Sequence, residues 1–253
     1  IMKWNNITIY QLQEIHSCRD MSHIEKTMNT LAIVKDWSMD KVESMPIDEL
    51  TTELKKLEFL NTLPTDKVRF SFRHRGRRWQ LAKTTNEICG HHFIELQQVF
   101  NGDMIESLHK VMALLTYEVD LLGRTKKVTD AQAHYQEKCE LFLSLPVTTA
   151  YSYAVFFFGS LSQVIGNYPN LFEGGDEPIE TGSVSPLAWL ELVDKIVKGD
   201  RTKWDTILQM PLIEFLNTIA FYKAKTKERQ KRLEQSATKG FNAYVVACLN
   251  EML

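Results

Sequence analysis

The sequence predicts a mainly α-helical protein, a multi-helix domain with one inserted β-hairpin and a C-terminal helical hairpin. Apolar residues recur three or four positions apart along most of the chain, which is the period of an amphipathic helix. Alternation with a period of two occurs at about 67–83, which is typical of paired strands. With 253 residues, of which 44% are hydrophobic, the chain is long enough to enclose a substantial core.

Composition limits the class of protein. The formal net charge of −2 at pH 7 excludes a nucleic-acid binder that relies on an overall basic surface. We expect no signal peptide, because the first residues lack a basic segment followed by an apolar run. The most apolar run, 153–158, is far too short to span a bilayer, so we expect a buried helix there and no membrane span. The cysteines are scattered, which is typical of free thiols in a reducing cytoplasm: Cys18, Cys89, Cys139 and Cys248.

The first 60 residues are predicted to be helical throughout. Residues 7–18 place their apolar side chains roughly on one side of a helix. Ser22 and Glu25 form a capping-box pattern that opens a second helix. The segment 37–60 predicts a short helix and, after Pro46, a longer one.

The period changes at about 67–83. Phe70 and Phe72 alternate with Arg69, Ser71 and Arg73, and Trp79 and Leu81 alternate with polar residues after a His-Arg-Gly turn. The segment therefore predicts a β-hairpin with one apolar face and one basic face. A lone hairpin is marginal in water, so it must pack on the helices or pair with another strand, from this chain or from another subunit.

The basic face of this hairpin is a candidate contact surface. Guanidinium groups can bind the phosphates of a nucleic acid, and Trp79 would be available to stack on a base. The alternatives are a solvated basic face or a docking patch for an acidic partner protein. The candidate residues are Arg69, Arg73, Arg75, Arg77, Arg78 and Trp79.

The middle of the chain predicts further helices. A second capping-box pattern at 84–87 is expected to start a helix that runs to Phe100, and the next helix is expected at 105–117. A third box at 129–132 opens another helix, and an apolar helix follows at about 149–165. The first of these helices and its neighbour contain possible zinc ligands, although adjacent histidines on a helix point in different directions, so we expect ordinary surface histidines and no metal or cofactor. These residues are Cys89, His91, His92 and His109.

A breaker-rich segment at 166–185 predicts a linker between a helical domain, 1–165, and a C-terminal region, 186–253. In that region Leu187, Leu190, Val193 and Val197 predict the buried stripe of a helix, which a Gly-Asp turn ends. A second helix starts at Pro211 with a buried stripe of its own. These apolar residues are Leu212, Phe215, Leu216, Ile219 and Tyr222.

After Tyr222 the second helix loses its apolar side, so 223–235 is expected to project into solvent or onto a partner. A final short amphipathic helix is expected at 241–253. The candidate partner-binding residues of the charged segment are Lys225, Lys227, Arg229, Lys231 and Arg232.

The segment 42–50 aligns without gaps on 207–215, and each contains a Met-Pro dipeptide that predicts the turn between two helices. A common way to start a helix is the preferred explanation of this similarity, and an internal duplication is the alternative. No phosphate-binding loop, nucleophile elbow or cysteine signature is present, so we expect no enzymatic activity.

Four segments resemble proteins of tailed bacteriophages, of the tail-assembly and virion-structural kind, especially in phages of gut Bacteroidetes including the crAss-like group. The segments read KWNNITIYQLQEI, MDKVESMPIDELTTELKKLEFL, the hairpin followed by TTNEI, and KGDRTKWDTILQMPLIEFLNTIAFYKAKTKERQKR. The resemblance implies no catalytic residues. It implies either a component of the virion tail, connector or cargo, or a tail assembly chaperone that leaves the particle. The partners would be other phage structural proteins and further copies in a symmetric assembly, located in the virion or in the bacterial host cytoplasm during assembly.

Overall fold

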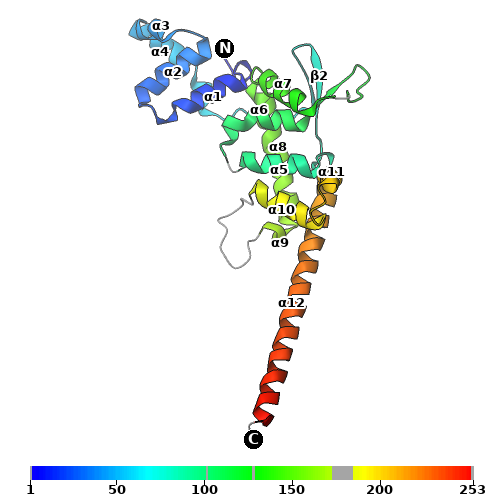
Figure 1. Cartoon of the computed structure of the whole chain (residues 1–253). Helices are drawn as coiled ribbons and strands as arrows, with labels where there is room; N and C mark the ends of the chain where they lie inside the picture. The colour runs from blue at the N-terminus through cyan, green and yellow to red at the C-terminus, as the bar shows by residue number, and fades with distance from the viewer. Residues whose placement is uncertain (1, 101, 127–128, 173–184, 252–253) are drawn as a thin grey trace.

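A computed structural model describes residues 2–100, 102–126, 129–172 and 185–251 of the chain, with the backbone alone for Phe100 and for 237–251. The fold is mainly α-helical with a small antiparallel sheet, as the sequence predicts (Figure 1). The helices are α1 (Ile9–Ser17), α2 (His23–Lys35), α3 (Met39–Glu43), α4 (Ile47–Lys55), α5 (Gly90–Phe100), α6 (Met104–Leu115), α7 (Ala131–Phe142), α8 (Val147–Gly166), α9 (Pro169–Phe172), α10 (Pro186–Ile196), α11 (Trp204–Leu208) and α12 (Leu212–Glu251). The strands are β1 (Ser71–His74), β2 (Arg77–Leu81) and β3 (Thr116–Val119), and the 3₁₀ turns are η1 (Trp4–Asn6), η2 (Cys18–Asp20), η3 (Glu58–Asn61), η4 (Thr85–Glu87) and η5 (Arg201–Lys203).

Helices α1, α2 and α3 each begin after a residue whose side chain accepts a hydrogen bond from the first turn. The Ser22 side chain accepts from the backbone N–H of Glu25, so the predicted capping box at the start of α2 is confirmed. Asp36 ends α2 in the left-handed conformation. The other two predicted boxes are wrong: Thr84 precedes only the turn η4 and α5 begins at Gly90, whereas Asp130 is the residue that caps α7.

Helix α6 lies at the centre of the molecule, where it packs against α1, α5, α7 and α8. The apolar run in α8 is buried on one side only: Tyr153 and Phe157 are fully buried, whereas Val155 is 49% exposed. The prediction of a buried helix there is therefore wrong for the exposed side of α8. Among the described helices, none combines the length and the apolar character needed to cross a bilayer.

The predicted hairpin forms, but its strands are shorter than 67–83 and they belong to a three-stranded sheet. The turn at Arg75 and Gly76 has φ of 48° and 75°, which matches the twist of a tight hairpin. Strand β3 pairs with β2 from the same chain, with Tyr117 opposite Gln80. Residues 116 and 117, expected to end a helix, are therefore strand residues.

The change from α6 to β3 depends on side chains from outside the segment. Thr116 Oγ1 donates to the Met112 carbonyl over 2.6 Å. The buried ammonium of Lys138 on α7 donates to the carbonyls of Ala113 and Thr116. The last carbonyls of a helix have no donor within the helix, so these bonds satisfy groups that would otherwise be buried and unpaired.

The C-terminal helices pack on α5 and share one continuous core with the rest of the chain. Gly90 N–H donates to the Met210 carbonyl over 3.1 Å, and Leu212 N–H donates to the Ile88 carbonyl over 2.9 Å. Next to this bridge, the ring centroids of Phe93 and Trp189 lie 5.3 Å apart in edge-to-face geometry.

The predicted stripe of α10 is right at Val193 and Val197, which are buried, and at Leu190, which is partly buried, but it is wrong at Leu187. Trp189 and Val193 are buried, while Leu187 is 64% exposed. The predicted stripe of α12 is confirmed for Leu212, Phe215, Leu216 and Ile219, which are fully buried, while Tyr222 at its end is only partly buried. The expected separate helix at 241–253 is wrong as far as it is described, since α12 continues to Glu251. Within the predicted 166–185 linker, α9 is helical, and 173–184 lies outside the described residues. Each Met-Pro pair stands between two helices as predicted, α3 and α4 in one case and α11 and α12 in the other.

Candidate functional site

The outer face of the sheet carries the exposed part of the predicted basic surface. Arg73 on β1 and Arg78 on β2 are both exposed and lie directly opposite each other across the two strands. Arg69 is exposed just before β1. Like charges directly opposite each other destabilise a strand pair, so this face is suited to an anionic group that neutralises both arginines.

The other arginines of the hairpin are engaged with the protein itself. Arg77 Nη2 lies 2.6 Å from a Glu137 carboxylate oxygen on α7, and Arg77 Nη1 lies 3.7 Å from Glu118 on β3. The hydrogen bond with Glu137 raises the pKa of Arg77, and the same bond lowers the pKa of Glu137. Arg75 Nε donates to the hydroxyl of Ser144 over 3.3 Å. These two side chains hold the hairpin against the helices.

Trp79 lies on the inner face and does not contribute to a contact surface. Its side chain is fully buried, and its ring centroid is 5.0 Å from that of Phe142 in edge-to-face geometry. The prediction that Trp79 could stack on a base is therefore wrong. The alternation predicted one apolar face correctly, and α7 covers that face.

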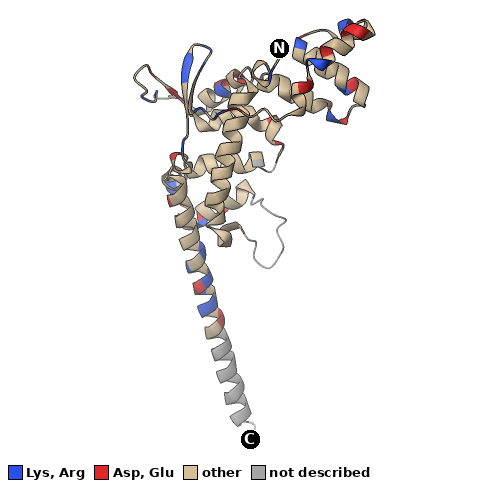
Figure 2. Cartoon of the chain, turned by 180° about the vertical axis from the view of Figure 1, so that it is seen from behind, with Lys and Arg blue, Asp and Glu red and all other residues tan. Residues whose placement is uncertain are grey.

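Helix α12 is anchored at one end and exposed along the rest. Its start is buried in the core, and Lys223 Nζ donates to the Leu171 carbonyl over 3.2 Å. Residues 224–236 are exposed on every side, and Figure 2 marks basic and acidic positions along this part of the helix. From Lys223 to Glu234 the sequence has six basic and two acidic residues, a net charge of +4. The exposed basic residues are those predicted: Lys225, Lys227, Arg229, Lys231 and Arg232.

The structure does not bring the two predicted surfaces together. The exposed part of α12 points away from the body on the side opposite the hairpin (Figures 1 and 2). A single partner would have to be extended to contact both. Each surface is therefore considered by itself.

The possible zinc ligands are engaged separately. Cys89 Sγ lies 3.4 Å from Nδ1 of His92, His91 pairs with Glu95, and His109 contacts Gln13. Burial lowers the pKa of His92 to about 4, so this imidazole is neutral at pH 7.

Among the described residues, a different group offers three ligand atoms within 4.8 Å of one another: His16, Asp103 and Glu106. Asp103 already caps α6, and its Oδ2 atom lies 2.5 Å from His16 and 3.1 Å from the guanidinium of Arg19. A guanidinium at this position opposes a metal cation, so the arrangement is that of a structural ion pair.

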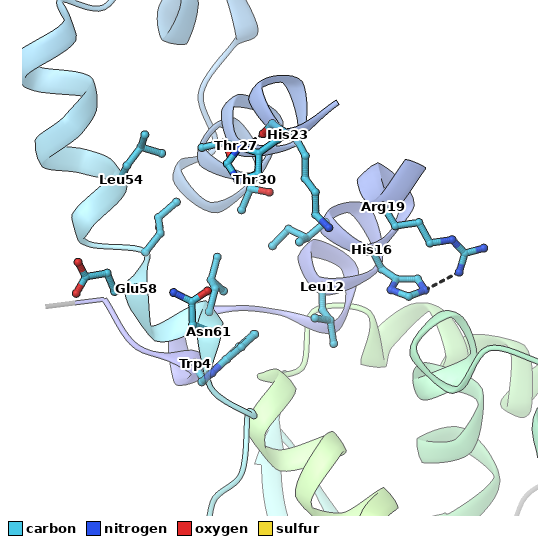
Figure 3. Close-up of a pocket in the computed structure, with 14 residues that line it drawn as sticks. Trp4, Leu12, His16, Arg19, His23, Thr27, Thr30, Leu54, Glu58 and Asn61 are labelled. Atoms are coloured by element: carbon cyan, nitrogen blue, oxygen red, sulfur yellow. Dashed lines mark hydrogen bonds between the residues drawn. The ribbon is translucent and has the colours of Figure 1, made fainter. Parts of the chain in front are cut away.

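A groove that the sequence does not predict lies between the N-terminal helices (Figure 3). It has a volume of about 580 Å³, and helices α1 and α2 face α4 and η3 across it. Most of its exposed lining is apolar. The amphipathic pattern of α4 was the available signal, because apolar residues along one side of a helix need something to cover them. The apolar lining residues are Trp4, Leu12, Ile15, Leu54, Leu57 and Leu60.

No model of a known protein family matches this chain, and no curated protein or solved structure does so either. Its function is therefore inferred from its own residues and geometry. The molecule has three candidate contact surfaces: the outer face of the sheet, the exposed segment of α12 and the groove beside α4.

Proposed function

We propose that this chain is a non-enzymatic structural or assembly protein of a tailed bacteriophage that acts through protein–protein contacts. The observation that carries the proposal is α12, which is fixed in the core at its start and exposed on all sides from residue 224 to 236. The resemblance of four segments to phage tail-assembly and virion proteins supplies the biological setting.

The length of α12 favours a connecting role. Its 40 residues correspond to about 60 Å of helix. A helix that is polar on every side has little intrinsic support, and such helices commonly bridge between separate bodies. The ion pair between Glu228 and Arg232, one turn apart, contributes only a few tenths of a kcal/mol, roughly 0.3 to 0.5. The aromatic cluster around Phe215 fixes one end, so the charged segment is held at a distance from the body where other subunits can reach it.

The basic character of the exposed segment favours an acidic partner surface. A net charge of +4 over three turns of helix attracts acidic subunits and speeds their association. Arg73 and Arg78 on the sheet offer a second, smaller contact. A nucleic-acid contact by the hairpin is the alternative, and it has lost support because Trp79 is buried and Arg77 is ion-paired.

Mass spectrometry on purified phage particles tests the proposal. The wild-type gene would be replaced by a charge-reversed α12 variant, Lys225→Glu with Lys227→Glu and Arg229→Glu. A matched hairpin variant would carry Arg73→Ser and Arg78→Ser. We expect wild-type protein in stoichiometric amounts and the α12 variant to be depleted from particles.

The other outcomes are equally informative. Wild-type protein that is abundant in infected cells but absent from particles would identify a tail assembly chaperone. Normal incorporation of the α12 variant, with DNA binding lost only in the hairpin variant, would contradict the proposal and favour a nucleic-acid-associated module. DNA binding would then weaken steeply with added salt.

A further inference from the structure

The groove beside α4 exposes apolar surface between elements that are otherwise well packed. Leu12 and Leu57 are nearly buried at its base, whereas Leu54 is only partly buried on the wall formed by α4. Helix α4 itself has no fully buried residue, and Ile47 at its start is 72% exposed. The Lys35–Glu53 ion pair of 2.5 Å, with both side chains largely buried, ties α4 to α2.

One wall of the groove is basic. Figure 3 shows His23 on α2 across the space from Leu54 and Glu58, whereas the side chains of His16 and Arg19 turn toward each other on the outer side of α1. Lys26 lines the same basic wall. Arg19 and His16 share Asp103, while His23 and Lys26 are exposed at the rim. An apolar base with basic groups on one wall is complementary to an amphipathic ligand that carries negative charge beside its apolar face.

The lining indicates how a ligand would be recognised. All of the apolar lining residues except Leu57 belong to helices or 3₁₀ turns. Backbone groups inside helices are already paired, so the groove offers no edge on which a partner strand could add hydrogen bonds. Recognition must use side chains, and a helix presents them at positions i, i+3, i+4 and i+7 on one face.

We propose that this groove docks an acidic amphipathic helix of a partner protein. The inference rests on the proposed function, which it deepens by assigning a second contact and its chemistry. The exposed segment of a second copy's α12 does not fit, because its charge has the same sign as the basic wall. The proposed occupant is a helix of a different subunit, with apolar residues on one helix face and carboxylates beside them.

Fluorescence anisotropy with a labelled synthetic peptide tests the inference. The peptide carries leucines at i, i+3, i+4 and i+7 with glutamates on the other face, and the control peptide carries lysines in place of the glutamates. Charge reversal at the exposed rim, His23→Glu with Lys26→Glu, should weaken binding about fivefold for each position. Leu54→Glu should weaken it by about tenfold or more. Lys55→Glu, the same substitution as Lys26→Glu but on α4 outside the lining, should leave binding unchanged.

Several results would overturn the inference. Equal binding of the acidic and lysine peptides, or equal losses in the rim variant and Lys55→Glu, would remove the groove as the site. Displacement of a fluorescent fatty acid by sodium oleate in a Leu54-dependent manner, with no peptide binding, would assign the groove to a small amphiphile. The rim variant guards against misfolding, because its two side chains are exposed.

The peptide assay is independent of the particle experiment. The α12 charge-reversed variant should bind the acidic peptide as the wild-type chain does. Peptide binding without incorporation into particles would leave the groove assigned and the proposed function wrong. Incorporation into particles without peptide binding would leave the proposed function standing and the groove inference wrong.

Discussion

Replacement of Gly90 by alanine should loosen the anchor of α12. Gly90 is the first residue of α5, and the ring of Phe215 lies directly against it. A Cβ atom added at Gly90 would lie 2.5, 2.7 and 2.9 Å from three atoms of that ring. Carbon atoms in contact normally stay about 3.5 to 4.0 Å apart, so the ring would have to move by about 1 Å.

The surroundings of Phe215 leave it little room. Its ring is fully buried, with the centroids of Trp189 and Phe93 at 5.9 and 6.5 Å. Forcing an extra methyl into a packed core typically costs about 1 to 3 kcal/mol, and alanine recovers less than about 1 kcal/mol through its better helix propensity. We therefore expect Gly90→Ala to lower the free energy of unfolding by about 2 kcal/mol.

Urea unfolding followed by circular dichroism measures this change. Gly159→Ala is the matched control, because it lies inside α8 with open space around it and should stabilise the chain by about 0.5 to 1 kcal/mol. Phe215→Leu makes room for the new methyl, so the double variant with Gly90→Ala should lose about 1 to 2 kcal/mol less than the sum of the single losses. A Gly90→Ala variant as stable as the wild type, or strict additivity in this cycle, would refute the reasoning.

Three further changes test other parts of the structure. Burial lowers the pKa of His92 to about 4, so between pH 6.5 and 4 the unfolded chain binds a proton that the folded chain does not. As the pH falls through this window, the free energy of unfolding should decrease by about 2 kcal/mol relative to that of His92→Gln, measured by urea unfolding. Burial lowers the pKa of Lys138 to about 8, so between about pH 8 and about pH 10 the unfolded chain keeps a proton that the folded chain loses. As the pH rises through this window, the free energy of unfolding of the wild-type chain should increase by about 2 kcal/mol relative to that of Lys138→Met. Identical pH profiles of the two chains would contradict the lowered pKa of Lys138. Arg75→Asn, at a turn position with φ of 48°, should raise the melting temperature through a gain of about 0.5 to 1 kcal/mol, and a loss would show that the bond to Ser144 matters more.

The helices could be predicted because their periodicity is local, but the strand β3 could not. The apolar pattern of α6 continues without interruption into Tyr117, and nothing nearby stops it. The helix ends because Ala82 N–H donates to the Leu115 carbonyl and Lys138 donates to the carbonyls of Ala113 and Thr116. Both donors are distant from this segment in sequence. Tertiary contacts of this kind override local propensity.

The sequence predicts that a helix has a buried face, but it does not decide between two stripes that lie side by side on the helix. In α10 the stripe through Leu187 and Val193 is as good a pattern as the one through Trp189 and Val193. The choice is made by Phe93 and Phe172, whose rings pack against Trp189. The same holds for the candidate surfaces, because only Glu118 and Glu137 decide that Arg77 is ion-paired, whereas Arg78 donates to the Leu121 carbonyl over 3.4 Å and stays exposed.

The direction of the charged segment of α12 is set by tertiary contacts that the local sequence pattern does not predict. Its own residues predict an exposed basic helix, but its direction depends on the bridge between Cys89 and Pro211 and on Phe215 packed against Gly90. A change at either place would move the proposed contact surface without altering its charge. Loss of partner contact in Gly90→Ala, with the basic residues intact, is therefore the result expected if α12 acts as a fixed connector, whereas a flexible basic tail would keep its contacts.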